Sequence, residues 1–164
     1  MPGTGVFFLT GALSISGLPL LNGFISEWLT FQALLLGFAS TPGLVRLNFP
    51  AGGAILALSA ALAAACFVKA FGITFLGRAR TPAAENAHDV DSFMLAAMYI
   101  LTALCFLAGI FPGVLIDMLA PVVSALVDGR MPPQSSISWL SIIPIGASRS
   151  SYNGMIILVF MLCS

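Results

Sequence analysis

The stretch Gly11-Ala-Leu-Ser-Ile-Ser-Gly-Leu-Pro-Leu-Leu-Asn-Gly-Phe-Ile-Ser-Glu-Trp, residues 11–28, decides the fold of this chain. It lies within an apolar segment from about residue 5 to residue 37, which is too long for one straight membrane span. The whole chain is 59% hydrophobic and 7% charged, with a mean hydropathy of +1.06, whereas a soluble domain carries about a quarter charged residues. We therefore expect an integral membrane protein.

The middle of this first segment predicts a break in the helix near residues 19–23. Pro19 lacks the N–H that a helix interior needs and clashes with the preceding turn, and Asn22 and Gly23 follow it. In lipid, irregular backbone is tolerated only where protein or a water-filled cavity satisfies its polar groups. A broken span is therefore a pointer to a functional site near the membrane midplane.

The rest of the chain predicts further spans, separated by polar connectors. We expect an all-α, polytopic transmembrane helix bundle with a discontinuous first helix, a single membrane domain over residues 1–164 that is a fragment of a larger fold. The expected spans are residues 5–37, 51–76, 93–111 and a partial or truncated 139–163, with a cytoplasmic loop over 77–92.

The distribution of arginines near the span ends predicts the orientation. Arg78 and Arg80 lie in one loop, whereas the connector before residue 51 carries only Arg46. The positive-inside rule then places the Arg78 loop in the cytoplasm. The first span would run outward and the second inward.

Glu27 is the candidate proton-carrying residue, because it is the only acid of the first span and follows the break. An isolated carboxylate in hydrocarbon faces the bundle interior, pairs with a cation or water, or takes up a proton. Each of these options suits a proton relay. The alternative is that Glu27 lies near the interface and caps the second half of the broken helix, where a carboxylate complements the helix dipole.

Lys69 lies about two thirds of the way along the second span and is the second relay candidate. A buried lysine loses its proton more readily, and a nearby carboxylate reverses that effect, so a Glu/Lys pair on neighbouring helices can pass protons. The alternative is that its long side chain reaches the headgroups, about 10 Å away at helical rise. The residues alone leave both interpretations open.

The remaining polar residues predict neither a metal site nor an organic active site. His88 lies among acids in the loop, without an established ligand spacing, and is better explained as part of a solvated loop. The three cysteines are far apart within apolar runs and have no zinc-binding or disulfide pattern. No basic tract suggests nucleic acid. We expect no metal and no cofactor on this chain.

Residues 11–35 resemble the broken-helix region of the antiporter-like, proton-translocating membrane subunits of complex I, cation/proton antiporter complexes and membrane-bound hydrogenases. The run from Cys66 to Arg78 and the later Ser150-Ser-Tyr-Asn-Gly look most like the hydrogenase-4 component B or formate hydrogenlyase subunit 3 branch. In that family an acid or lysine follows the break of a late discontinuous helix, and Glu27 falls at that position. Many relatives have two consecutive prolines where this chain has Pro19 and Leu20.

The resemblance implies a C-terminal fragment of a proton- or cation/proton-translocating subunit in the membrane arm of a hydrogenase or complex I-like (NADH dehydrogenase-like) oxidoreductase. It implies a non-catalytic, multi-pass subunit of a bacterial inner membrane, surrounded by lipid and by other membrane and peripheral subunits that carry the redox groups. One alternative is a structural anchor or assembly subunit without its own ion path. Another is a membrane-embedded enzyme acting on lipid or peptide, for which no nucleophile or metal set is evident.

Overall fold

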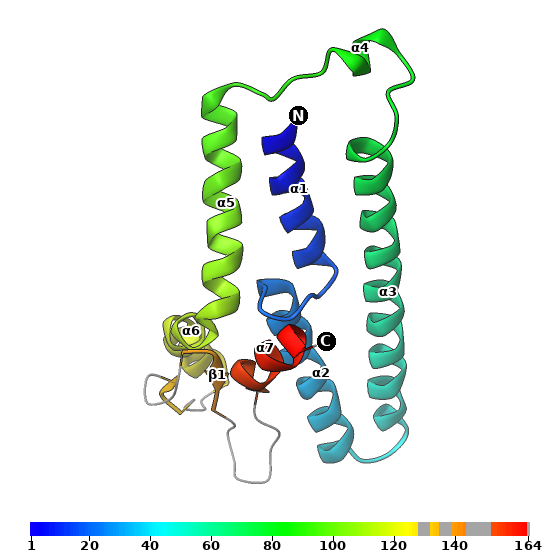
Figure 1. Ribbon diagram of the computed structural model, residues 1–164. Helices are drawn as coiled ribbons and strands as arrows, with labels where there is room; N and C mark the ends of the chain where they lie inside the picture. Colours follow the sequence, from blue (N-terminus) through cyan, green and yellow to red (C-terminus); the bar gives the residue numbers. More distant parts are fainter. Residues whose placement is uncertain (128–131, 135–138, 144–151, 164) are drawn as a thin grey trace.

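The computed structural model describes residues 1–127, 132–134, 139–143 and 152–163. This part of the chain is almost entirely helical, as predicted (Figure 1). The helices are α1 (Pro2–Ile15), α2 (Asn22–Ser40), the 3₁₀ helix η1 (Leu44–Leu47), α3 (Asn48–Phe75), α4 (Pro82–Glu85), α5 (Ser92–Ile110), α6 (Pro112–Val127) and α7 (Gly154–Cys163). Two short strands, β1 (Ser141–Ile142) and β2 (Tyr152–Asn153), pair antiparallel.

The broken helix forms the middle of the bundle. In Figure 1, α1 and α2 follow one another through the centre, with α3 on one side and α5 on the other. Helices α2 and α3 form an antiparallel pair, because the ring of Phe49 lies against Gly37 and the side chain of Leu34 lies against Gly52. Small residues at these contacts allow the two backbones to approach closely, as in other membrane helix pairs.

Aromatic side chains pack α1 against its two neighbours, α3 and α5. The ring of Phe8 lies 6.5 Å from that of Phe71 and 5.4 Å from that of Phe75, both on α3. On the other side, Phe7 meets Tyr99 of α5 edge to face at 6.4 Å. Such pairs stabilise by about 0.5–1.5 kcal/mol beyond the area that they bury. The aromatic contacts therefore fix α1 relative to both long helices.

Asp89, in the loop before α5, caps the first turn of α1 from a distance in sequence. Its carboxylate accepts hydrogen bonds from the backbone N–H groups of Gly3 and Thr4 at 3.1 and 3.0 Å, and from the Thr4 hydroxyl at 2.9 Å. The bond from the Thr4 N–H is the largest cause that lowers the pKa of Asp89 below its ordinary value. These donors are among those that a helix leaves unpaired at its start, so the loop is tied to α1.

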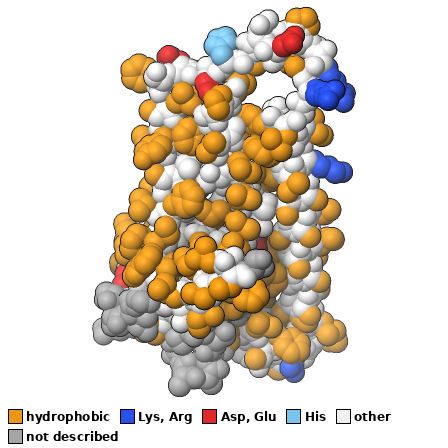
Figure 2. Space-filling model, viewed as in Figure 1, with side chains coloured by type: hydrophobic (Ala, Val, Ile, Leu, Met, Phe, Trp, Pro, Cys, Tyr) orange, Lys and Arg blue, Asp and Glu red, His pale blue; other side chains and the backbone are white. Residues whose placement is uncertain are grey.

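The face of the bundle that Figure 2 shows is largely apolar along the length of the helices. Within the described residues, the stretches Leu44–Phe75 and Ser92–Ile110 are long and apolar enough to cross a membrane, with mean hydropathies of 2.1 and 2.3. In the most apolar 18 residues of each stretch, no residue of the first and 6% of the residues of the second are buried within the chain. Apolar helices with so few buried residues are suited to lipid or to neighbouring membrane helices.

The predicted segment 139–163 lies partly outside the described residues. Its described parts are not one helix: Leu140, at 1% exposure, precedes the strand pair, and α7 begins at Gly154. In Figure 1, α7 lies in front of the first turns of α2, beyond the break. Tyr152 of β2 packs on Phe24 and Trp28 of α2, so this segment contacts the second half of the broken helix and does not extend the row of long helices.

Candidate functional site at a helix break

Helix α1 ends in a glycine C-cap that satisfies its last carbonyl groups. Gly17 has a φ of +68°, its N–H donates to the carbonyl of Ser14, and the N–H of Leu18 donates to the carbonyl of Leu13, both at 3.2 Å. This pair of bonds, around a left-handed glycine, is a Schellman motif. The sequence thus stops α1 by local chemistry, before Pro19 is reached.

A tight turn then reverses the chain within the break. The N–H of Leu21 donates to the carbonyl of Leu18 at 3.2 Å, with Pro19 in the second position of the turn and Leu20, at a φ of +74°, in the third. This is the pattern of a type II turn, where glycine or asparagine usually takes the third position. Proline could not adopt this φ, so the turn requires a residue other than a second proline at position 20.

Neighbouring backbone packs directly against the turn. A Cβ on Gly109 of α5 would overlap the carbonyl oxygen of Leu20, and a Cβ on Gly23 would overlap that of Ser14. The hydroxyl of Ser14, a residue that is 6% exposed, donates to the side-chain oxygen of Asn22 across the break. Pro19 therefore lies in the break itself, while Asn22 and Gly23 form the first turn of α2, which packs against the end of α1.

The carboxylate of Glu27 reaches back along α2 to the break. A Cβ on Gly17 would lie 2.7 Å from Oε2 and 3.4 Å from Oε1 of Glu27. Long side chains on a helix point toward its N-terminus, so Glu27 is directed at the break by its own helix. Glu27 is half-buried, and it makes no ion pair or hydrogen bond with a residue in the described ranges.

An aromatic cluster adjoins Glu27 on the first turns of α2. The rings of Phe24 and Trp28 lie 6.2 Å apart, and Tyr152 of β2 packs against both, at 5.9 and 6.2 Å. Tyr152 is 2% exposed. Tyr152 of β2 therefore completes an aromatic cluster with Phe24 and Trp28, beside the helix turn that carries Glu27.

Lys69 is not a neighbour of Glu27 in this structure. Across the antiparallel pair of α2 and α3, Glu27 lies level with about residue 59 or 60, so Lys69 is about 14 Å further along the helix axis. Lys69 is exposed, and Leu62, Cys66 and Ile73 on the same side of α3 are exposed as well. The lysine thus stands within an uncovered apolar face.

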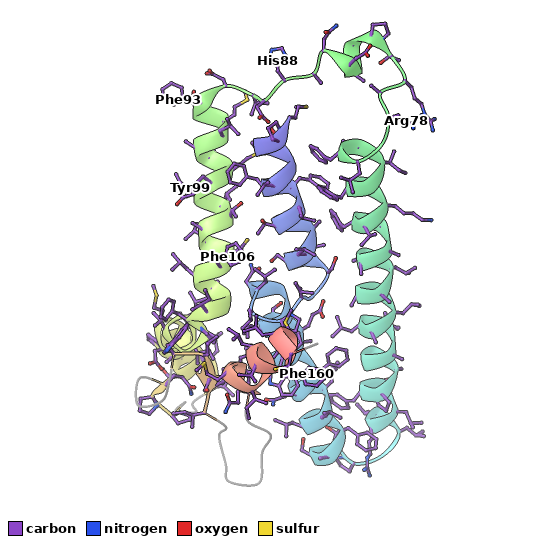
Figure 3. All side chains as sticks on the ribbon, in the orientation of Figure 1. Arg78, His88, Phe93, Tyr99, Phe106 and Phe160 are labelled. Carbon is purple, nitrogen blue, oxygen red and sulfur yellow. The ribbon has the colours of Figure 1, made fainter. Side chains whose placement is uncertain are left out.

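Two other polar residues, His88 and Asp117, have partners of their own in other parts of the fold. Figure 3 shows His88 on the loop between α4 and α5, where its Nδ1 lies 3.1 Å from the carbonyl oxygen of Asn86. Asp117 of α6 accepts a hydrogen bond from the N–H of Gln134 at 2.9 Å. Within the described ranges, no three His, Cys, Asp or Glu side chains lie close enough together to hold a metal ion.

Two residues of the site were not recognised from the sequence. Ser14 bridges the break through Asn22, and its signal is a polar residue one turn before the end of an otherwise apolar helix. Gly109 contacts the turn from 89 residues away in sequence, and a glycine near the end of an apolar span carries no signal of its own for that contact. Only the packing of α5 on the break reveals it.

Comparison with curated proteins identifies the relatives of this chain. It is 35% identical to hydrogenase-4 component B of Escherichia coli over 162 residues, 99% of this chain and 24% of the relative. It is 35% identical to formate hydrogenlyase subunit 3 of the same organism over 123 residues, 75% of this chain and 20% of the relative. The chain belongs to the family of these two proteins. This confirms the resemblance inferred from residues 11–35.

Two further findings bound that conclusion. The chain spans about a quarter of the length of hydrogenase-4 component B and a fifth of that of formate hydrogenlyase subunit 3. An uncharacterized protein of Mycobacterium tuberculosis is 37% identical over 112 residues, 68% of this chain and 18% of that protein. No family model matches the chain.

Proposed function

We propose that this chain carries part of an ion path through a membrane, in which Glu27 takes up and releases a proton at the break between α1 and α2. The proposal rests on one observation above all: the Glu27 carboxylate lies against Gly17, at the point where the helix is interrupted. An ionisable side chain at an interrupted span is the usual arrangement of a transport site.

The break supplies polar backbone groups that can stabilise the Glu27 carboxylate. Peptide groups between Ile15 and Asn22 leave the regular helix, and only some of them are paired within the turn. In a medium of low dielectric constant, a charge on Glu27 is stabilised by nearby dipoles and water, and protonation removes the need for them. Proton uptake and release at Glu27 would then be coupled to the hydration of the break.

The relatives of the chain indicate the kind of complex in which it would work. The names of its relatives, hydrogenase-4 component B and formate hydrogenlyase subunit 3, are those of subunits of hydrogenase-type complexes. We therefore propose that the chain works in the membrane arm of a redox complex, as a multi-pass protein of a bacterial inner membrane. Electron transfer would occur on partner subunits, with no cofactor held by this chain.

Lys69 enters this proposal in a different way from Glu27. About 14 Å of helix separates the two levels, so we propose that Lys69 does not exchange a proton with Glu27 directly. The lysine lies on an exposed apolar face of α3. It would join the path through a carboxylate on a helix that packs on that face, because a charge in hydrocarbon seeks a partner.

The test replaces Glu27 by Gln, which keeps the shape and removes the titratable proton. Proton movement is measured in vesicles that contain the complete complex, energised by its own electron donor. The matched control is Glu85→Gln, at an exposed acid of α4. We expect the Glu27 variant to assemble normally and to move protons at about one hundredth of the wild-type rate or less, the usual effect of losing one proton-transfer group. Undiminished transport would instead favour a structural anchor.

A further inference from the structure

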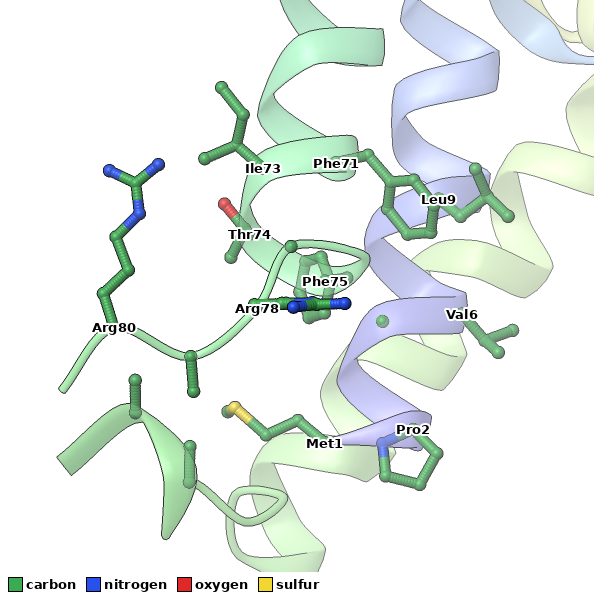
Figure 4. Close-up of a pocket in the computed structure, with 15 residues that line it drawn as sticks. Met1, Pro2, Val6, Leu9, Phe71, Ile73, Thr74, Phe75, Arg78 and Arg80 are labelled. Atoms are coloured by element: carbon green, nitrogen blue, oxygen red, sulfur yellow. The ribbon is translucent and has the colours of Figure 1, made fainter. Parts of the chain in front are cut away.

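An open cavity of about 750 Å³ lies between α1 and the end of α3, at the opposite end of α1 from the break (Figure 4). Its walls are apolar: Pro2, Val6 and Leu9 come from α1, and Phe71 and Phe75 come from α3. The loop that follows α3 closes one side, with Ala84 and Ala87 beyond it. The volume is within the range of about 300–1,000 Å³ that is usual for ligand sites.

Two arginines form the polar part of this cavity. Arg78 and Arg80 both line it. Figure 4 shows Arg78 directed toward α1 across the space between the two helices, and Arg80 directed away from α1, toward the level of Ile73. Neither guanidinium has an ion pair or hydrogen-bond partner among the residues that the structure describes. No acid is among the lining residues. The cavity therefore presents uncompensated positive charge above apolar walls.

The cavity lies at the level where a membrane surface would meet the bundle. The candidate span Leu44–Phe75 ends three residues before Arg78. The guanidinium of Arg78 would then lie in the headgroup layer, while Phe71, Val6 and Leu9 lie at the depth of the acyl chains. Basic pockets between helices at this depth suit anionic headgroups, and a guanidinium can bind a phosphate through two parallel hydrogen bonds.

We propose that this cavity, at the end of α1 and α3, binds an anionic phospholipid, with its phosphate on Arg78, its acyl chains along Val6, Leu9 and Phe71, and Arg80 adding positive charge at the rim. A soluble phosphate compound would bind the arginines but would leave the apolar walls of the cavity exposed to water. A zwitterionic lipid would fill the groove but would bring its own positive charge close to the arginines. Only an anionic lipid matches both parts of the site.

The test titrates the purified complex in detergent with a short-chain phosphatidylglycerol and measures the bound lipid by native mass spectrometry. We expect the double variant Arg78→Gln/Arg80→Gln to bind about 10- to 30-fold more weakly, since each surface cation strengthens binding to anionic lipid severalfold. The control is Arg46→Gln, whose guanidinium lies over the Phe38 ring near the other end of α3. Equal binding by the double variant and the wild type would overturn the proposal.

Two further arms separate the sources of the phosphate and test the apolar half of the site. Inorganic phosphate should compete poorly, and phosphatidylcholine should bind at least tenfold more weakly than phosphatidylglycerol. Val6→Trp, at a wall residue that is 61% exposed, should fill the groove without disturbing the fold and should also weaken binding. Competition by inorganic phosphate at equal concentration, or full binding by the Val6 variant, would show a free-anion site and contradict a lipid site.

Discussion

Replacing Gly17 by Ala tests the contact between Glu27 and the helix break. The new Cβ would lie 2.7 Å from Oε2, about 0.7 Å short of the 3.4 Å at which ordinary contact begins. The carboxylate must therefore move. In addition, alanine at a φ of +68° costs about 1–2 kcal/mol because its Cβ approaches the following carbonyl oxygen. We expect a loss of stability of at least that size, together with a displaced carboxylate.

Displacing the Glu27 carboxylate should also slow proton movement. A displacement of about 1 Å of a reacting group reduces rates by up to about 100-fold, so we expect proton movement to fall at least tenfold while the complex still assembles. Thermal unfolding of the purified protein measures the first effect, and proton uptake into vesicles measures the second. The control is Gly43→Ala, which is also strained, at a φ of +75°, but has no atom within 4 Å of the new Cβ.

A double variant separates backbone strain from the contact itself. If Gly17→Ala acts partly by displacing the carboxylate, then adding Glu27→Ala should recover part of the stability that the single variant loses, giving an interaction energy of about 0.5 kcal/mol or more. Strictly additive losses in stability would refute the contact. Normal proton movement in the Gly17 variant would refute its role in transport.

Three further outcomes follow from the packing around the break and from the loop. Asp89→Asn should lower thermal stability at neutral pH, because folding lowers the pKa of the native carboxyl group and its charged form therefore stabilises the folded state. This stabilisation is fully present above the unfolded pKa of about 3.9 and is lost as the pH falls through the lower pKa of the folded state. The thermal stabilities of variant and wild type should therefore converge in acid. Gly109→Ala should cost about 1–3 kcal/mol in thermal unfolding, since its Cβ overlaps the Leu20 carbonyl, whereas Gly72→Ala, with nothing within 4 Å, should be neutral or stabilising. Lys69→Met should leave the thermal stability of the purified chain within about 0.5 kcal/mol of wild type, because the side chain is exposed; a larger loss would mean that Lys69 has a partner within the chain.

The existence of the break was predictable, because its causes are local. Pro19 and the glycine before it stop a helix whatever surrounds them. The details of the turn were less predictable. Leu20 occupies a left-handed conformation that is uncommon for a branched side chain, and it is held there by Gly109, whose backbone packs on its carbonyl from a distant helix. Local propensity cannot report such a contact.

The two candidate relay residues show the same limit. The position of Glu27 after the break follows from the sequence, because a helix directs its side chains toward its own start. The relation between Glu27 and Lys69 does not follow, since it depends on the register between α2 and α3, which Gly37 and Gly52 set through their contacts with Phe49 and Leu34. The polar loop was likewise expected to be solvated, but Asp89 within it caps α1.

The role of Glu27 depends on where its carboxylate lies as well as on its charge, and Glu27→Asp separates the two. Aspartate keeps the titratable group but withdraws it from Gly17 by one methylene, about 1.5 Å, a misplacement that would severely reduce a geometrically demanding transfer. In vesicles containing the complete complex, we predict that proton movement falls at least tenfold in this variant, with normal assembly. Wild-type rates with aspartate would contradict the claim that contact with the break is what makes this acid functional.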